Sequence, residues 1–460
     1  MGHNLRKRGL VAQFRHRSPS LLALCTASEP QDGSVNCQHQ DRELQMPDLD
    51  RRSFIAAASI TASLVSAPVV DAREPAKVKS ISAMTMAPDG RLVLADWRSG
   101  SLHVLDLPKP GGSGKTAAFN LVAFDEALAN AGSRRVRATA LAWQEHAGRA
   151  IVAAEIGGRV LLALATADGS VTIHDPDDWH VQSLALSDLP GEGSLWGKAS
   201  VRTLTVTCFA WQGNELLISG IANADFASTL RRIAYPFGKQ PKSTRIEMYH
   251  AVHNQLETRA PIRAMDVVTL GGIPHLLAAY TCTPLVIVPL AELVDQSRLR
   301  AKTIAELGFG NTPLSVMSFA IEYQGQSSDW VLVANAAKSA DLIALPAIAE
   351  AAAGQGLTQP VKAPFDQFAG VRAIPVPLGN LVAVADQGDE FLLALRRDAQ
   401  TGALELVSFR KGAFFRLSDH VNEYDMPGYA YPEGDSFLQG YIRPFHAMMK
   451  RDEGHAELIR

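Results

Sequence analysis

Short apolar runs separated by turn residues recur along most of the chain, and they have the length of β-strands rather than of helices. The clearest copy is residues 262–290, whose three apolar runs are residues 262–269, 275–280 and 285–290. Gly271-Gly272 separates the first two runs and is typical of a tight hairpin, while Thr283-Pro284 breaks the chain before the third. This segment predicts three consecutive antiparallel strands.

The three-strand unit repeats, because residues 92–107 align with residues 275–290 without a gap. Similar units, roughly 50 to 65 residues apart, start near Val78, Val136, Val201, Ile262, Leu314 and Val371. A fourth apolar run follows in most units, for example residues 117–122, 181–186, 246–250 and 404–409. Repeated four-stranded units are typical of a β-propeller. We therefore predict an all-β fold, a β-propeller of six four-stranded blades over residues 78–410, with seven blades as the alternative. A two-layer sandwich would not need six copies of one unit.

Composition changes this picture little. The chain of 460 residues is 47% hydrophobic and 20% charged, which is ordinary for a globular protein. A net charge of -3 gives no reason to expect nucleic acid or an anionic membrane surface as a partner. No internal apolar run is long enough to predict a membrane span.

The N-terminal region predicts export. Arg51-Arg52 is followed by a mildly apolar run, residues 56–67, and by Val70-Asp71-Ala72, which has the form of a cleavage site. These features indicate a twin-arginine (Tat) signal peptide over residues 46–72 and a periplasmic location. Residues 1–45 are then an upstream extension, non-native or disordered, with translation beginning at Met46. Residues 411–460 have no regular period and are expected to pack on or cap the propeller.

Cations recur where the units begin. In a propeller the first strand of each blade begins on the side where the second strand ends, because adjacent strands are antiparallel. The predicted positions are Lys79, Arg137, Arg202, Arg263 and Arg372. Guanidinium groups bind carboxylates and phosphates in a bidentate manner, so a ring of these cations at the channel mouth would hold an anionic ligand. The structural alternative is pairing with the carboxylates Asp96, Glu155 and Asp386, which end the second strands.

A second candidate site is the connection before the fourth unit. It contains His250, His253 and Glu257, and Cys282 is expected on the same side of the propeller. Imidazole and thiolate groups suit zinc or copper. However, two histidines three residues apart on an extended segment point to opposite sides, so the alternative is a loop held by hydrogen bonds.

A third candidate site combines Glu155, Asn335 and Asp386, each at the predicted end of a second strand. By position in the repeat, this trio resembles the divalent-metal site, such as a calcium site, of gluconolactonase-type six-bladed propellers. The resemblance implies a lactonase or esterase-type hydrolase. The chain has no Cys-x-x-Cys-His motif, which excludes covalent c-type haem, and the Gly-rich residues 111–116 lack the spacing of a P-loop.

The turn Asp89-Gly90-Arg91, the run 93–96 and residues 100–106 resemble the YVTN and quinoprotein amine dehydrogenase β-chain-like propellers. That resemblance implies a fold and a compartment, and it transfers no catalytic residue. We interpret the chain as a binding or accessory module, associated with a periplasmic redox protein or binding a small anionic ligand at the Arg-lined channel mouth. The alternatives are the metal-dependent hydrolase and a ligand-free interaction scaffold.

Overall fold

The computed structural model describes residues 77–411, apart from residues 110–116, 283, 309–310, 324–325, 362–368, 377, 389 and 399–400. All of these belong to one compact unit of the chain. The predicted signal peptide, the upstream extension and the tail after Lys411 lie outside the described residues, as do the Gly-rich residues 111–116. No helix in the described part is long and apolar enough to cross a membrane.

The described part is mostly β-structure, and its strands form several sheets of four. The first is β1 (Ala83–Met86), β2 (Leu92–Asp96), β3 (Ser101–Leu105) and β9 (His180–Ala185). A second sheet consists of β5 (Val136–Gln144), β6 (Arg149–Ile156), β7 (Arg159–Thr166) and β8 (Val171–His174). Another consists of β21 (Pro313–Tyr323), β22 (Gln326–Asn335), β23 (Ala340–Ala344) and β25 (Ile374–Val376). The last consists of β26 (Leu381–Asp386), β27 (Phe391–Arg397), β28 (Leu404–Arg410) and β4 (Asn120–Leu121).

A ten-stranded sheet contains two further runs of four antiparallel strands. One run is β12 (Cys208–Gln212), β13 (Glu215–Ile221), β14 (Ser228–Ala234) and β15 (Lys242–His250), and the other is β17 (Ile262–Leu270), β18 (Ile273–Tyr280), β19 (Pro284–Pro289) and β20 (Arg298–Glu306). Their outermost strands, β15 and β20, pair in parallel and so join the two runs. Short strands β16 (Gln255–Glu257) and β24 (Ala369–Gly370) pair with β15 and β20.

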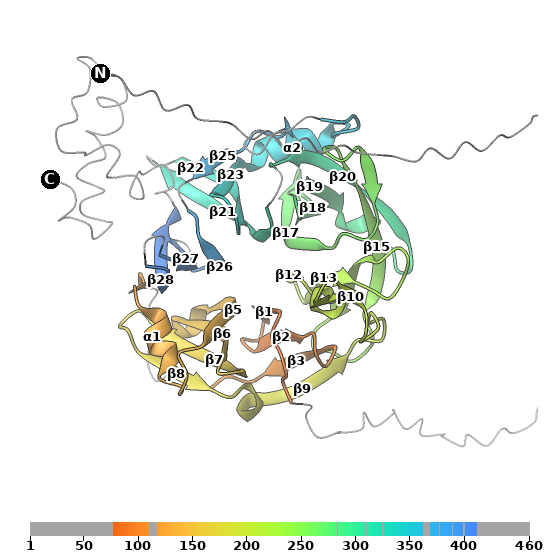
Figure 1. Cartoon of the computed structure of the whole chain (residues 1–460). Coiled ribbons are helices and arrows are strands. Elements are labelled where there is room, and N and C mark those ends of the chain that lie inside the picture. The colour runs from red at the N-terminus through yellow and green to blue at the C-terminus, as the bar shows by residue number, and fades with distance from the viewer. Residues whose placement is uncertain are drawn as a thin grey trace, which may run out of the picture. The chain divides into compact units, whose positions relative to one another are not determined.

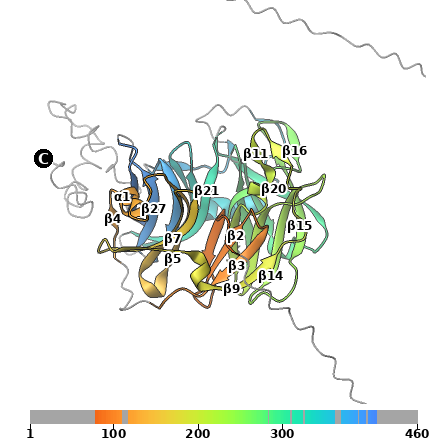
Figure 2. The same cartoon turned by 60° about the horizontal axis from the view of Figure 1, so that its bottom comes forward.

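The remaining elements are short. A two-stranded hairpin is formed by β10 (Leu195–Trp196) and β11 (Ala199–Ser200). The helices are α1 (Phe124–Ala129), α2 (Leu345–Ala353), η1 (Glu145–Ala147), η2 (Pro176–Trp179), η3 (Val201–Leu204) and η4 (Leu290–Glu292). Figure 2 shows β11 and β16 on one side of the sheets.

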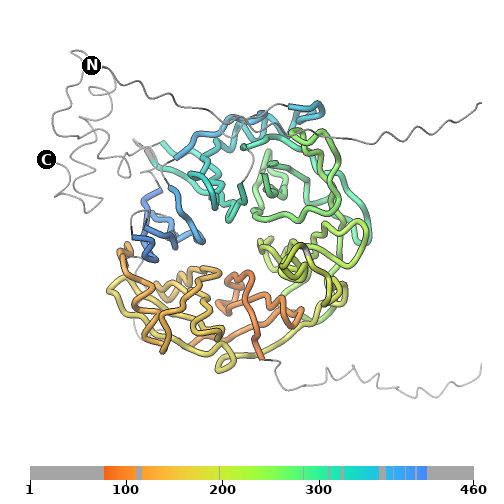
Figure 3. The backbone as a smooth tube through the Cα atoms, viewed as in Figure 1, coloured from red at the N-terminus to blue at the C-terminus, as the bar shows by residue number. Residues whose placement is uncertain are grey.

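The sheets stand side by side around a common axis, with β1, β5, β12, β17, β21 and β26 innermost (Figures 1 and 3). Neighbouring inner strands contact one another in the closed order β1, β5, β26, β21, β17, β12 and back to β1. Among the described residues, six buried apolar clusters each take residues from two neighbouring sheets in this same order. Burial of these faces is the driving force for the ring. The fold is therefore propeller-like.

The template segment has the predicted form. Residues 262–290 are β17, β18 and β19, and the turn between the first two has positive φ at Gly271 (56°) and Gly272 (81°), as a two-residue hairpin requires. The small residues at the ends of the second strands are buried: Ala153, Ala154, Ala278, Ala279 and Ala334 are at most 1% exposed. These small side chains let neighbouring sheets approach closely.

The pairing of the fourth strands differs from the prediction. The apolar run 117–122 was assigned to the first unit, but β4 pairs with β28 of the last sheet. The run 181–186 was assigned to the second unit, but β9 pairs with β3 of the first. The run 404–409 is β28, the third strand of its sheet. As a result, the first sheet sits between the second and the third, and β4 joins an early part of the chain to the last sheet.

The last unit also begins later than predicted. Val371 and Arg372 lie between β24, which pairs with β20, and β25, which pairs with β23. The inner strand of the last sheet is β26, starting at Leu381. Asp386 therefore ends an inner strand, not a second strand.

Candidate functional site

The inner strands enclose a central cavity of about 470 Å³, lined by residues from all six of them. Four of these strands carry a β-bulge near their start, and the extra residues are Thr139, Arg263, Leu314 and Val382. Ser82 and Thr207 take the matching places immediately before β1 and β12, where their N–H groups bond to the carbonyls of Ala95 and Ser219. A β-bulge redirects a side chain out of the regular alternation. All six residues line the cavity.

The three hydroxyls at this level donate to main-chain carbonyls. Thr207 Oγ1 donates to the Ile262 carbonyl at 2.5 Å and Thr139 Oγ1 to the Ala153 carbonyl at 3.3 Å. Ser82 Oγ lies 3.1 Å from the Val206 carbonyl. The Ser82 and Thr207 bonds link neighbouring sheets at the beginnings of their inner strands, whereas the Thr139 bond is to β6 of its own sheet. Leu314 and Val382 are apolar, so Arg263 is the charged member of this level of the cavity.

Arg263 has no partner among the residues that the structure describes. Its Nε is buried without a hydrogen bond, and no side-chain hydrogen bond or ion pair joins it to any residue that the structure describes. Burial lowers the pKa of its guanidinium, but an arginine keeps its charge at neutral pH. The thiol of Cys208 is near, and burial raises its pKa to about 11, so this thiol does not supply a counter-charge. A positive charge that is partly buried and uncompensated is unfavourable unless an anion joins it.

The two carboxylates that line the cavity lie farther along the inner strands, Asp266 in the middle of β17 and Asp386 at the end of β26, and both have partners. Asp266 accepts from the Ser318 N–H and hydroxyl, each at 2.7 Å, which ties β17 to β21. Burial raises the pKa of Asp266 and these bonds oppose that rise. Asp386 forms an ion pair of 2.8 Å with Lys411. The cavity thus has a cation, unpaired among the described residues, near the start of the inner strands and satisfied carboxylates farther along them.

The predicted ring of five cations does not form, since Arg263 is the one of the five that lines the cavity. Lys79 is exposed and precedes β1, and Arg372 is exposed between outer strands. Arg202 lies in η3, where its Nη1 is 3.2 Å from Glu192 Oε1. Arg137 pairs with Glu155 at 2.8 Å, as the structural alternative expected.

Most of these cations do not face the cavity, because the hairpins of the units differ in length and equivalent residues are not at a fixed distance from the glycine of the following turn. Gly213 follows Thr207 by six residues, whereas Gly90 follows Ser82 by eight. The difference comes from the hairpin turns, which have five residues between β1 and β2 but two between β12 and β13.

Replacing Arg137 is expected to have a small effect on stability, and the variant also serves as a control for Arg263. Its side chain is 66% exposed, so the ion pair with Glu155 is screened by solvent. We expect Arg137→Gln to change the free energy of unfolding by less than about 1 kcal/mol in chemical denaturation. A loss of several kcal/mol would show that this pair holds the second sheet together.

The trio Glu155, Asn335 and Asp386 does not converge. Asp386 ends the inner strand β26, while Glu155 and Asn335 lie at or near the ends of second strands, on the other side of the ring because neighbouring strands are antiparallel. Asn335 is fully buried; its amide accepts from Asn311 at 2.6 Å and donates to Asp341 at 2.9 Å. The prediction of a gluconolactonase-like metal site is therefore wrong in its geometry.

The structure does bring His250, His253 and Glu257 together, with possible ligand atoms within 4.8 Å of one another. β15 ends at His250 and pairs with β16 through a turn in which Asn254 has a positive φ of 51°. This turn folds His253 back over His250, and their ring centroids are 3.7 Å apart. The expectation that the two histidines point to opposite sides is wrong for this reason. Cys282 is not part of the group.

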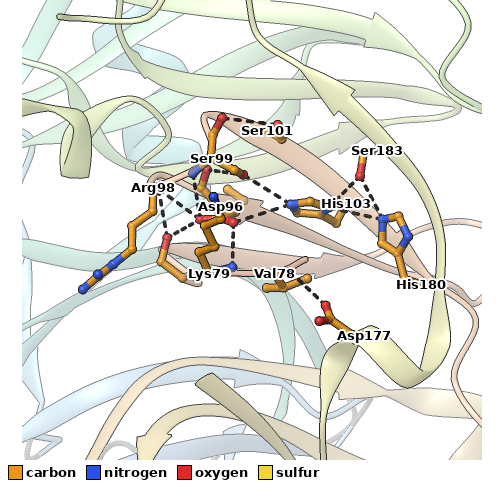
Figure 4. Close-up of polar contacts among 12 residues, drawn as sticks. Val78, Lys79, Asp96, Arg98, Ser99, Ser101, His103, Asp177, His180 and Ser183 are labelled. Carbon is orange, nitrogen blue, oxygen red and sulfur yellow. Dashed lines mark hydrogen bonds and ion pairs between the residues drawn. The ribbon is translucent and has the colours of Figure 1, made fainter. Parts of the chain in front are cut away.

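An extended polar network lies in the first sheet, around Asp96 (Figure 4). Asp96 is 1% exposed and accepts from the main-chain N–H groups of Lys79 (2.8 Å) and Arg98 (3.0 Å) and from the Ser80 hydroxyl. His103 is fully buried, 3.6 Å from Asp96 and 2.9 Å from the Ser183 hydroxyl. Burial raises the pKa of Asp96, but the nearby His103 imidazole, at 3.6 Å, and the hydrogen bonds from Ser80 and the Lys79 N–H outweigh it and lower the pKa overall.

The order carboxylate, imidazole, hydroxyl in this network is also that of a serine hydrolase, but the geometry does not support catalysis. The Asp96–His103 separation is beyond hydrogen-bond distance, and Ser183 lies on β9, the outermost strand of its sheet. Ser183 lines neither the central cavity nor the pocket beside β7 and β8. The network joins β2, β3 and β9 to the segment that precedes β1 and is structural.

Comparison with known proteins adds little. No known protein family matches the chain, and no curated protein is similar to it. Among solved structures, it is similar to a chain of the mitotic checkpoint complex (9% identity over 82% of this chain and 100% of the other, TM-score 0.28). It is also similar to PorZ of the type-IX secretion system of Porphyromonas gingivalis, with 8% identity over 73% of this chain and 37% of the PorZ chain and a TM-score of 0.29. A third similar structure is the PQQ-bound aldose sugar dehydrogenase from Streptomyces coelicolor, with 11% identity over 73% of this chain and 96% of the dehydrogenase chain and a TM-score of 0.25. Likenesses this weak carry no argument about function.

Proposed function

We propose that this protein is a β-propeller binding module whose central cavity takes a small anionic ligand through Arg263. The observation that carries the proposal is a guanidinium group without a partner in the described part of the chain, placed by a β-bulge in the wall of a cavity of about 470 Å³. Carboxylates and phosphates pair with guanidinium through two parallel hydrogen bonds. Either group would supply the missing counter-charge.

The carboxylates of the cavity narrow the ligand class. Asp266 and Asp386 line it farther along the inner strands, so a second anionic group reaching them would meet like charge. The proposed ligand therefore has one carboxylate or phosphate at the Arg263 end and a neutral or cationic remainder. A cavity of this volume suits a small metabolite rather than a peptide or polymer.

The proposal takes the ring as six blades, each of four strands. Its support is the closed order of inner strands and the two runs of four strands in the ten-stranded sheet. The predictions of Tat export, of a periplasmic location and of a redox-protein partner are part of the same proposal. They rest on residues 46–72 and on the resemblance to amine dehydrogenase β-chain-like propellers.

Thermal unfolding in the presence of simple anions tests the proposal. The protein is first dialysed into Tris chloride and then titrated separately with inorganic phosphate, acetate and the zwitterion β-alanine. A ligand at 100 times its dissociation constant stabilises the native state by about 2.7 kcal/mol. We expect at least one of these probes to raise the Tm of the wild type and of Arg137→Gln, and none to raise that of Arg263→Gln. An equal response of all three proteins would overturn the proposal, as would a wild type that responds to none.

A further inference from the structure

A second group of residues, separate from the central cavity, has the composition of a transition-metal site. It lies at the outer edge of the ring, where β15 and β20 run in parallel and then part. β15 ends at His250, and β20 ends at Glu306. His253 and Glu257 come from the turn after β15 and from β16.

The hydrogen bonds within the group are explicit. The Nδ1 atoms of His250 and His253 each lie 2.8 Å from the same oxygen, Glu257 Oε1. When this carboxylate is ionised, each imidazole donates a proton to it from Nδ1, and a neutral ring then has no proton on Nε2. Glu257 and His250 are diagonal neighbours across the β15–β16 hairpin, since His250 pairs with Gln255 and Met248 with Glu257.

That pattern leaves two buried atoms unsatisfied. His250 is 1% exposed and Glu306 is fully buried, and neither His250 Nε2 nor Glu306 Oε2 has a hydrogen-bond partner. These two atoms are 3.7 Å apart and face each other. The other oxygen of Glu306 accepts from the Ala251 N–H at 2.7 Å, which fixes the carboxylate in place. Buried polar atoms without partners are rare and call for an explanation.

We propose that His250, His253 and Glu257 bind a zinc-like divalent cation, with Glu306 as the carboxylate that orients His250. A metal that takes Nδ1 of His250 requires the ring proton to be on Nε2, where it points at Glu306 Oε2. Both orphan atoms are then satisfied. Histidine ligands of metals usually donate their second N–H to a carboxylate in this way. Metal binding therefore completes hydrogen bonds that the metal-free arrangement leaves unmade.

The donor set fits zinc. Two histidine nitrogens and one carboxylate oxygen are a known zinc ligand set, with a fourth position for water or another ligand. His253 is 43% exposed, so the group is reached from solvent. Ligand atoms around tetrahedral zinc are about 3.3 Å apart, given metal–ligand distances of about 2.0–2.1 Å. The two contacts of 2.8 Å must therefore open by about half an ångström, which a turn of four residues permits.

The test is metal stoichiometry and affinity on the full chain, stripped with chelator and titrated with Zn²⁺ by calorimetry, with Co²⁺ absorption as a report on coordination. His253→Ala is the main variant because His253 is exposed and its loss does not open the core. His146→Ala is the matched control, since His146 is an exposed histidine in η1, outside any cluster. We expect one site with an affinity at least 100-fold weaker in His253→Ala and unchanged in His146→Ala.

Glu306→Gln separates an orienting role from a structural one. We expect it to weaken Zn²⁺ binding by about 10–100-fold and to alter the Co²⁺ spectrum, while circular dichroism stays that of the folded protein. The proposal is overturned if the wild type binds no Zn²⁺, or if wild type and His253→Ala bind it with the same stoichiometry and affinity. Neither result bears on the anion proposal, because Arg263 is unchanged in all of these proteins.

Discussion

Replacing Arg263 with leucine is expected to abolish anion binding in the central cavity and to make the ligand-free protein more stable, by about 1 kcal/mol or more. The reason is that the substitution removes a partly buried charge that no described residue compensates. The repeat itself shows that an apolar residue fits this place, because Leu314 and Val382 are the bulged residues of β21 and β26. Chemical denaturation in Tris chloride, without phosphate or carboxylates, measures the effect.

Arg137→Leu is the matched control for that substitution, because Arg137 is also an arginine near the start of an inner strand but is exposed and paired with Glu155. It should leave stability nearly unchanged. If Arg263→Leu instead destabilises the protein in the absence of anions, then Arg263 makes a structural contact and the cavity is not its ligand site.

Replacing Asp96 with alanine is expected to lower the free energy of unfolding by about 3–5 kcal/mol. The substitution leaves the buried Ser80 hydroxyl and the partly buried main-chain N–H groups of Lys79 and Arg98 without their acceptor, and it removes the carboxylate beside His103. Breaking a buried charged network by removing one member has costs of this size. Asp177→Ala is the control, since Asp177 is partly exposed and accepts one bond of this network, from the Val78 N–H. A loss no larger than that of the control would show that the network in Figure 4 does not hold the first sheet together.

The contribution of Asp96 to the free energy of unfolding also depends on pH. Its pKa in the folded protein is below the value of about 3.9 for an unperturbed aspartate, so the stability that it contributes is present above pH 4. That contribution is lost as the pH falls below this value, because the unfolded chain takes up the proton first. The difference in stability between wild type and Asp96→Ala should therefore shrink on acidification.

The strands of this fold could be predicted from sequence, but their partners could not. Residues 262–290 have alternating turns and apolar runs that specify three strands, and the structure confirms them as β17, β18 and β19. The runs that became β4 and β9 were recognised as apolar, yet nothing in a local pattern states which edge a strand will join. Both pair with sheets other than those nearest in the sequence.

The residues of the candidate sites were likewise predictable only in part. The sequence predicts Arg263 at the cavity, but it predicts four further cations there that do not line the cavity. The local pattern cannot distinguish them, because one bulge or one inserted turn changes which residue faces inward. For His253, the signal that was missed is Asn254, a residue type that favours the left-handed turn conformation it adopts here. Glu306 has no signal in the sequence, since it joins the group through the parallel pairing of β15 and β20.

The most direct test of the central claim is a crystal structure of the protein grown with arsenate, a phosphate analogue that anomalous scattering locates without ambiguity. The anion proposal predicts an arsenic peak in the central cavity, with two arsenate oxygens in hydrogen-bond distance of the Arg263 guanidinium, and no such peak in Arg263→Leu. A cavity without arsenic, in which the Arg263 guanidinium is bonded to a carboxylate or carbonyl of the protein itself, would contradict it.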